Sequence, residues 1–565
     1  MSIFRILTGF AIFAAVLSLF AIFGSQQSGV WYSVVPPLAG VVLAFVTRRL
    51  LWSLLAAMLL GALLVAIEQG ETASTFFPTG IGLAFTYAYK ALLDPWSLKI
   101  LGFVFCILSM ISVIILSGGL KGIVTYLQRY SHGARSSQLM TAVLGLLVFI
   151  DDYANTMIVG SAMRPVTDSH RVSREKLAFI IDATSAPVAG LAVISTWIGY
   201  ETGLFTKVSE SLQIGLDGYS MFFDALAFRF YCVLMLLFVF LNIIMQREFG
   251  AMHRISSSSL GSNSVSPQIV QHSHSGFSMV DASADARISA WSAILPLGLM
   301  MFTLLGGLWI DGKGLSLFQQ SLFAPLLPWM WMDVITQAKN SSTILLLSAS
   351  VGLIAAAACA TFIAHVSWAA IARAAYVGVR SSLLPVGILV LAWSLKSACD
   401  ALGTGEFLAH SIGQVLQPFW FPLLLFAAAA LTSFGTGTSW GTMAILIPTA
   451  IPVAYALDGN QYGLITMISL GAVLDGAIFG DHCSPISDTT IMSSIASGCD
   501  HLEHVRTQIP YSLTVALTAA LCGYIPVALE FSPLLSYVTG FFVLWAILYF
   551  SPRAYSRVGA SPDNG

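Results

Sequence analysis

The residues best suited to chemistry in this sequence are aspartates that lie inside long apolar stretches. Asp151 and Asp152 are adjacent, and Asp182, Asp481 and Asp488 follow in two later stretches. A carboxylate at the centre of a bilayer costs about 2.5–3.5 kcal/mol, so each is by default a functional candidate. A buried carboxyl group can bind a proton or a hard cation, and this is the chemistry that we expect.

Each aspartate also has a structural interpretation. One of Asp151 and Asp152 could cap a helix while the other faces water. Asp182 could equally be a cap or the partner of an arginine. For Asp481 a functional role is favoured, whereas Asp488 is balanced between the two interpretations.

Helix-breaking and polar residues surround these aspartates in four segments, at 149–156, 182–187, 433–442 and 480–490. Gly, Pro, Ser and Thr interrupt helices in mid-membrane and free backbone carbonyls, and a hard cation such as Na⁺ needs oxygen ligands. Besides the aspartates, the candidate oxygen ligands are Asn155, Thr156, Ser185, Thr442 and Ser484. The alternative for each hydroxyl is a hydrogen bond to the preceding turn of its own helix.

Metal-dependent and ATP-driven chemistry find little support. The seven cysteines contain no C-x-x-C pair, and the runs 481–483 and 499–501 match no standard zinc spacing. Neither an H-E-x-x-H nor a Walker sequence occurs. We therefore expect no enzyme activity, no cofactor and no transition metal, with Na⁺ alone at the aspartate sites.

The composition defines the setting of these residues. Of the 565 residues, 57% are hydrophobic and only 9% are charged, whereas soluble proteins have about 25% charged residues. The mean hydropathy is +0.84, and apolar runs near bilayer length recur throughout the chain. The formal net charge of −2 offers no basic field for nucleic acid. The sequence predicts an all-α polytopic membrane protein.

Lys and Arg mark the cytoplasmic loops of such a protein. The basic residues place Lys176 and the segment 501–506 in cytoplasmic loops, whereas Glu201 belongs to an acidic loop on the other side. By this rule the apolar stretch 136–163 has basic flanks at both ends, and the stretch 417–452 has acidic or neutral flanks at both ends. Each should return to the side from which it entered, so we expect two re-entrant hairpins. These oppositely facing hairpins should bring acidic oxygens together inside the membrane, with residues 151–156 close to residues 481–488. About twelve transmembrane helices then remain, with both termini cytoplasmic and the protein in the cytoplasmic (inner) membrane.

The predicted spans, which include 227–246 and 462–497, fall into two units of the same order. Residues 30–246 and 289–530 each give three spans, a hairpin and two spans, and the odd number of crossings predicts an inverted repeat. The remaining segments are an N-terminal membrane helix (1–29), a disordered Ser-rich cytoplasmic linker (247–288), and a last helix with a cytoplasmic tail (531–565). Partners other than ions and lipid stay open, with a homodimer among the alternatives.

These motifs carry a family resemblance. Residues 149–155, 163–168, 173–177, 182–187, 441–442, 480–490 and 499–511 resemble the NhaC family of Na⁺/H⁺ antiporters. The resemblance extends over about 30–530 and implies secondary active transport with an inverted-repeat fold. It also implies that the substrate is less fixed than the fold, because some relatives move malate and lactate.

Three functions follow for testing. The first is exchange of Na⁺ for H⁺, in which one aspartate holds either a proton or Na⁺ but not both. The second is Na⁺-coupled transport or exchange of a small organic acid or an amino acid, with half-helix N-termini facing the anion. The third is a membrane enzyme built on Asp481, His482 and Cys483, which would need a bound metal.

Overall fold

The architecture comes from a computed structural model of the whole chain. It describes residues 31–553 except 48, 73, 129, 131, 259–282, 284–285, 318–333, 335–337 and 414–415. The predicted N-terminal helix at 1–29, most of the Ser-rich linker and the end of the tail lie outside the described residues.

The regular structure in the described part of the chain is helical, which confirms an all-α membrane protein. Ten helices there are long and apolar enough to cross a membrane, or eleven if α12 (Gly218–Leu226) and α13 (Phe230–Met245), bent by 48°, form one span. The expectation was about twelve spans besides the hairpins. Both helices of the second hairpin are among the ten, so length alone does not decide whether its tip stops inside the bilayer.

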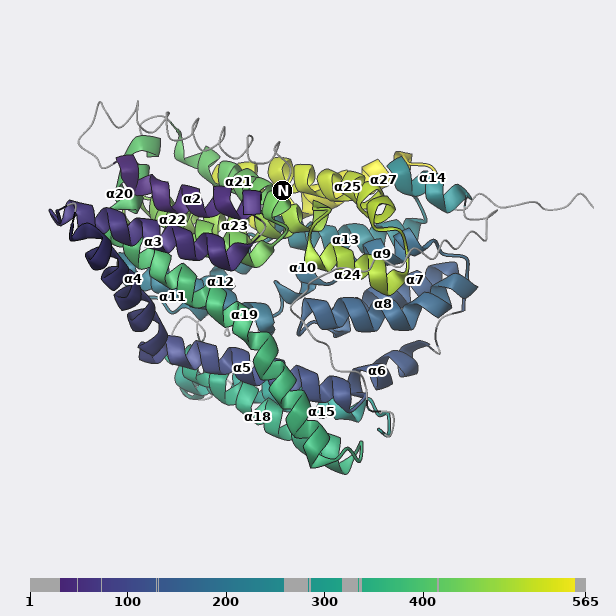
Figure 1. Cartoon of the computed structure of the whole chain (residues 1–565). Helices are drawn as coiled ribbons and strands as arrows, with labels where there is room; N and C mark the ends of the chain where they lie inside the picture. Colours follow the sequence, from purple (N-terminus) through teal and green to yellow (C-terminus); the bar gives the residue numbers. More distant parts are fainter. Residues whose placement is uncertain are drawn as a thin grey trace, which may run out of the picture.

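A group of mostly apolar helices includes α5, α15 and α18, which lie together at the bottom of Figure 1, and α2 and α3, which lie higher in the same view. α5 packs against α18 and α19, α15 packs against α18, and α3 packs against both α2 and α19. The bounds are α2 Val35–Thr47, α3 Leu50–Glu68, α5 Pro95–Leu116, α15 Trp291–Asp311, α18 Ser341–Phe362 and α19 Trp368–Ala401. With 34 residues, α19 is about 51 Å long and exceeds a bilayer core.

Two helix–turn–helix pairs stand at the predicted hairpin positions. The first joins α7 (Ala134–Leu147) to α8 (Asp152–Ser169), and the second joins α21 (Phe421–Thr436) to α22 (Ser439–Leu457). Local sequence sets both turns. Asp151 caps α8 by accepting a hydrogen bond from the Ala154 N–H at 2.8 Å. Gly437 ends α21 with φ +71°, a backbone conformation that favours glycine.

A broken helix follows each pair. After the first pair come α9 (Arg174–Ala183), the one-turn α10 (Ala186–Ala189) and α11 (Thr196–Leu212). After the second come α23 (Leu464–Cys483) and α24 (Asp488–Ser497), separated by a break at Ser484–Ser487. A helix–turn–helix pair followed by a broken helix therefore occurs in both halves of the chain, while the two inverted repeat units stay a prediction.

The two units interlock. α24 of the second unit packs against α8 and α9 of the first, and α11 of the first packs against α22 of the second. Within the second unit α21 lies along α23 so closely that a Cβ on Gly480 would stand 2.1 Å from the Ala430 carbonyl oxygen. The breaks and the turns consequently lie near one another.

Several boundaries differ from the sequence prediction. The chain from Gly250 to Ser258 forms α14 instead of disordered linker, because its Ala251 and Met252 are buried and the helix packs on α25. The expected loop at 501–506 is the first turns of α25 (His501–Thr518). The remaining bounds are η1 Trp31–Val34, α4 Phe76–Leu93, α6 Gly119–Gln128, α16 Gly314–Leu317, α20 Thr404–Gly413, η3 Pro418–Trp420, η4 Ala519–Tyr524, α26 Ile525–Ala528 and α27 Pro533–Phe550.

Candidate functional site

A cavity of about 740 Å³ lies where both hairpin turns meet the second helix break. Its polar wall comes from the two turns, the break and the start of α11, and the opposite wall comes from α2, α3, α5 and α19. The residues that line it are Ala44, Arg49, Leu50, Leu51, Trp52, Leu108, Asp151, Asp152, Tyr153, Thr196, Leu384, Pro385, Ile388, Thr436, Gly437, Thr438, Trp440, Pro485, Ile486, Asp488 and Ile491. The predicted convergence of the segments near 151 and 488 is therefore present.

Asp151 is held firmly, whereas Asp152 is not. Besides capping α8, Asp151 accepts a hydrogen bond from the Thr196 hydroxyl at 3.1 Å, and the Thr196 N–H donates to the Ile150 carbonyl at 2.8 Å. Asp152 is 2% exposed, and its Oδ1 has no hydrogen-bond partner. Of the two expected roles, the cap belongs to Asp151, and Asp152 lines the cavity while keeping one buried carboxyl oxygen without a hydrogen-bond partner.

The second break adds two more carboxyl groups. Asp488 begins α24 and is exposed to the cavity. Asp481 is buried, accepts a hydrogen bond from the Thr489 hydroxyl at 3.3 Å through Oδ2, and has no partner at Oδ1. Asp481 lies within electrostatic range of Asp152, Asp182 and Asp488. A cation or proton in this region would relieve the repulsion among these groups.

Asn155 and two serines hold the breaks in place. The Asn155 side-chain amide donates to the Gly145 carbonyl at 2.7 Å and to the Thr184 carbonyl at 3.0 Å, while its Oδ1 has no partner. The Ser185 hydroxyl donates to the Asp182 carbonyl, and the Ser484 hydroxyl donates to the Phe434 carbonyl at 2.8 Å. Asn155 therefore joins the first hairpin to the first helix break and still has a buried acceptor to offer.

Thr156 and Thr442 follow the structural alternative. The Thr156 hydroxyl donates to the Asp152 carbonyl at 2.8 Å, and the Thr442 hydroxyl donates to the Thr438 carbonyl at 3.0 Å. Both are bonds to the preceding turn of the same helix. Their hydroxyl oxygens keep lone pairs, so these bonds do not by themselves exclude a cation.

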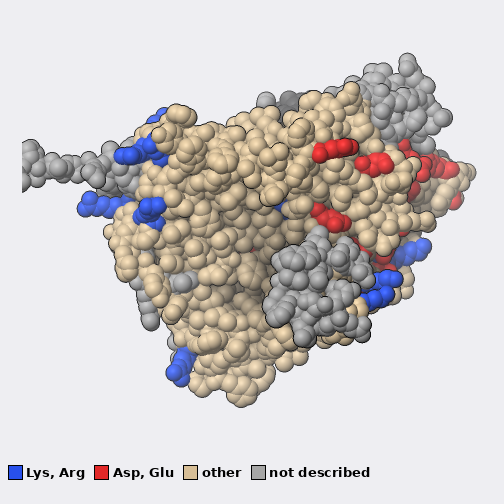
Figure 2. All heavy atoms as spheres, turned by 180° about the vertical axis from the view of Figure 1, so that it is seen from behind, with Lys and Arg blue, Asp and Glu red and all other residues tan. Residues whose placement is uncertain are grey.

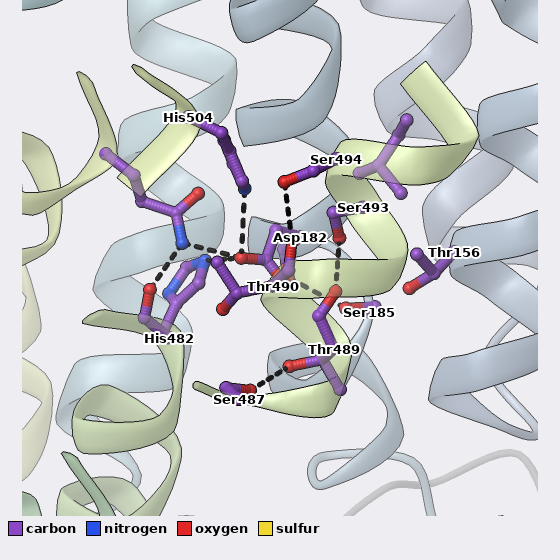
Figure 3. A network of polar contacts seen from close by, with 12 residues as sticks. Thr156, Asp182, Ser185, His482, Ser487, Thr489, Thr490, Ser493, Ser494 and His504 are labelled. Carbon is purple, nitrogen blue, oxygen red and sulfur yellow. Dashed lines mark hydrogen bonds and ion pairs between the residues drawn. The ribbon is translucent and has the colours of Figure 1, made fainter. Parts of the chain in front are cut away.

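Asp182 lies away from the cavity lining in a cluster of its own (Figure 3). Its Oδ2 accepts a hydrogen bond from the Gln508 amide at 2.6 Å and lies 3.4 Å from His504 Nε2 and 3.8 Å from His482 Nε2. Neither the predicted cap nor an arginine partner is present in this described cluster. The sequence missed His504 because it placed residue 504 in a loop, and the structure buries it completely in α25.

A second ionisable cluster was also missed. Arg229, Glu201 and Asp475 are all fully buried, and the Arg229 Nε donates to Asp475 at 2.8 Å. The Glu201 side chain, expected in an external loop, lies inside α11. The signal was present in the sequence, because Arg229 and Asp475 fall within the predicted spans 227–246 and 462–497.

The geometry gives little support to a metal site or to a serine hydrolase. No group of three or more His, Cys, Asp and Glu in the described residues is arranged to hold a metal ion. Residues 437–441 match the G-x-S-x-G pattern of serine hydrolases, but Ser439 stands in the first turn of α22 and its hydroxyl donates to the Ala477 carbonyl at 3.2 Å. The hydrolase pattern requires a strand–turn–helix elbow, whereas Ser439 follows the turn between two helices, α21 and α22.

Broken helices, paired hairpin turns and carboxyl oxygens around one cavity define a membrane transporter. Comparison with known proteins agrees with this class. A model of the Na⁺/H⁺ antiporter family matches residues 188–525, which is more than half of the chain. The chain belongs to this family, whose members are transporters and not enzymes.

The relatives and a solved structure resemble the chain to different extents. An uncharacterized protein of Haemophilus influenzae is 29% identical over 547 residues, 93% of this chain and 95% of its own. The malate-2H⁺/Na⁺-lactate antiporter of Bacillus subtilis is 33% identical over 26% of this chain and 30% of its own. The Na⁺/H⁺ antiporter NhaC of Alkalihalophilus pseudofirmus is 30% identical over 27% and 33%. The YdaH transporter of Alcanivorax borkumensis has a similar fold, with a TM-score of 0.53 and 15% identity over 80% of this chain and 90% of that structure.

The Asn155 contacts generate a first prediction. Replacing Asn155 by Leu removes both donors and leaves two buried carbonyl groups unpaired, so we expect a loss of about 1–3 kcal/mol of stability. Thermal unfolding of the detergent-solubilised protein measures it. Thr303→Val is the control, because Thr303 is only half-buried and its hydroxyl donates to the Leu299 carbonyl of its own helix. Equal unfolding temperatures for the two variants would contradict the role given to Asn155.

Proposed function

We propose that this protein is a secondary active transporter that exchanges Na⁺ for H⁺ across the cytoplasmic membrane. The observation that carries the proposal is the convergence of both hairpin turns and the second helix break on one cavity that holds Asp151, Asp152 and Asp488. Membership in the Na⁺/H⁺ antiporter family supports the choice of ions.

Competition for one carboxyl group supplies the coupling. Burial disfavours an ionised carboxyl group, so the empty site prefers a proton, whereas bound Na⁺ favours the ionised form. Asp152 is the best placed, because it is nearly inaccessible and its Oδ1 has no donor. A site that holds either ion but not both moves them in opposite directions when it faces the two sides of the membrane in turn.

The remaining candidate residues form two groups around this carboxyl. Those that can supply oxygen to Na⁺ are Asp151, Asn155, Thr156, Thr442, Asp481 and Asp488. Asp182, Ser185 and Ser484 act one layer further from the cavity, where they position the breaks. Asp182 also contacts two buried histidines, which suits it to proton transfer behind the Na⁺ site.

The distribution of surface charge supports an orientation. In Figure 2 the charged side chains at the left end of the molecule are Lys and Arg, while Asp and Glu gather toward the right end, where some Lys and Arg are also present. By the positive-inside rule the basic end is cytoplasmic. α27 ends beside the start of α14, where the Arg247 guanidinium donates to the Ser551 carbonyl at 2.6 Å. This contact keeps the end of α27 on the same side as the basic segment near Arg247, and so supports a cytoplasmic C-terminus. The cytoplasmic N-terminus rests only on the distribution of Lys and Arg along the sequence.

The size of the cavity favours a second candidate function. A volume of about 740 Å³ is far larger than one Na⁺ needs and lies in the range of small-molecule sites. Arg49 and three aspartates line the same cavity. Arg49 can therefore bind the carboxylate of an organic acid, while the aspartates bind the cation that accompanies it. The Bacillus relative is named as a malate and lactate antiporter.

Proteoliposomes separate the two candidates, because an ion exchanger supports Na⁺-driven proton flux without any organic solute, whereas the alternative requires labelled malate or lactate to move.

Removing single carboxyl charges tests the proposed site. Asp152→Asn and Asp481→Asn keep the shape but cannot ionise, so we expect Na⁺-evoked proton flux to fall at least about tenfold, the effect of losing about 1.4 kcal/mol of Na⁺ binding. Everted vesicles with a ΔpH-sensitive dye give the flux. Asp400→Asn is the matched control, because Asp400 lies outside the cavity lining and pairs with Lys396 at 2.6 Å near the C-terminal end of α19. Undiminished flux in both site variants would remove the carboxyl mechanism.

Competition also predicts a pH dependence. Lowering the proton concentration frees the shared carboxyl group for Na⁺, so the half-saturating Na⁺ concentration should fall as the pH rises, by up to about tenfold per pH unit while the proton is the dominant occupant. Initial rates in the same vesicles at a series of pH values measure it. A half-saturating concentration that stays constant across pH would indicate separate sites for the two ions.

A further inference from the structure

The cluster of Arg229, Asp475 and Glu201 has no part in the cavity and yet is fully enclosed. Arg229 precedes α13, Asp475 lies in α23, and Glu201 lies in α11. Each side chain has zero exposure to solvent. These groups are therefore required to balance charge and hydrogen bonds among themselves and their immediate neighbours.

Asp475 has its full set of partners. Its Oδ1 accepts from the Arg229 Nε at 2.8 Å, and its Oδ2 accepts from the Tyr231 N–H at 2.6 Å and the Tyr524 hydroxyl at 2.8 Å. Arg229 donates further to the Gly190 carbonyl at 3.0 Å. Asp475 and Arg229 thus form a hydrogen-bonded ion pair, and the positive charge of Arg229 is used by Asp475.

Glu201 is different. The Arg229 Nη1 approaches its Oε1 only to 3.7 Å, and neither carboxyl oxygen of Glu201 has a hydrogen-bond partner. An ionised carboxylate normally accepts several short hydrogen bonds, and a buried one without them is strongly disfavoured. With one guanidinium and two carboxyl groups, the cluster would carry a net charge of −1 if Glu201 were ionised.

The neighbouring titratable groups do not correct this imbalance. The groups with electrostatic contact to the three residues are Tyr200, Tyr524, Tyr537 and Cys232. All are phenols or thiols, which are neutral or negative and never positive. Among the described residues the neutralising cation is Arg229 alone, and it is already paired with Asp475.

We propose that Glu201 is a proton-binding site separate from the cavity, and that it holds a proton in the conformation described here. The site is placed to sense movement of the first broken helix. Glu201 lies in α11, whose first residue Thr196 donates to Asp151, while Arg229 contacts Gly190 on the other side of the same break. A shift of α11 that brought Glu201 into hydrogen-bond contact with Arg229 would favour release of the proton. This last step depends on the proposed exchange, but the bound proton does not.

Infrared spectroscopy of the purified full-length protein tests the proton directly. A protonated carboxyl group has a C=O stretching band that a carboxylate and an amide lack. We expect the difference spectrum between the wild type and Glu201→Gln at neutral pH to contain this band. We also expect the band to shift when glutamate carboxyl groups carry ¹³C and to stay in place when aspartate does. The isotope assigns the proton to Glu201 and not to Asp475 or to the cavity aspartates.

The matched control is Glu210→Gln, because Glu210 is on the same helix but is half exposed and pairs with Lys207 at 3.0 Å. Its spectrum should match the wild type. A wild-type spectrum without any glutamate-derived acid band at neutral pH would overturn the proposal, and this measurement needs no variant to fold. Because the band is read without transport, its absence is distinguishable from failure of the Na⁺/H⁺ exchange.

Discussion

A helix that ends inside a membrane must find partners for its free backbone groups within the protein, and this constraint shapes the functional region. Asp151 caps α8, and the Ser195 hydroxyl caps α11 by accepting from Trp197 and Ile198. The Ser484 hydroxyl in turn reaches the Phe434 carbonyl near the end of α21. Each of these three side chains lies in a turn or a helix break, where the backbone does not continue a helix. The polar side chains therefore stabilise the interruptions and also line the space that the interruptions create.

This arrangement separates satisfied from unsatisfied carboxyl groups. Asp151 and Asp475 each receive bonds on both oxygens, and each holds helices together. Asp152, Asp481 and Glu201 each retain a buried oxygen without a donor. In a low dielectric such an oxygen is costly unless a proton or cation joins it, so binding capacity follows from hydrogen bonds that are absent. The two classes cannot be told apart by residue type.

The sequence predicted the helical membrane fold, the two hairpin positions and the meeting of the 151 and 488 segments, because charge bias and helix breakers act locally. It did not predict the partners of Asp182, since His482, His504 and Gln508 come close only through packing of α25 against α9 and α23. It misplaced Lys176 as a loop residue, although the structure buries it against Glu248 at 3.1 Å. A basic residue at a helix end is the same in sequence whether it faces water or a buried partner.

The packing of α24 against α8 and α9 has a consequence for how the protein folds during its synthesis. During synthesis, α8 and α9 leave the ribosome long before α24 (Asp488–Ser497) has been made. The first hairpin therefore has no α24 to pack against during that time. Contacts between segments so distant in the chain are slow to form, because loop closure precedes any gain from them. The early half should therefore stay loosely assembled in the lipid, and translation arrest before residue 488 should leave it sensitive to membrane quality-control proteases.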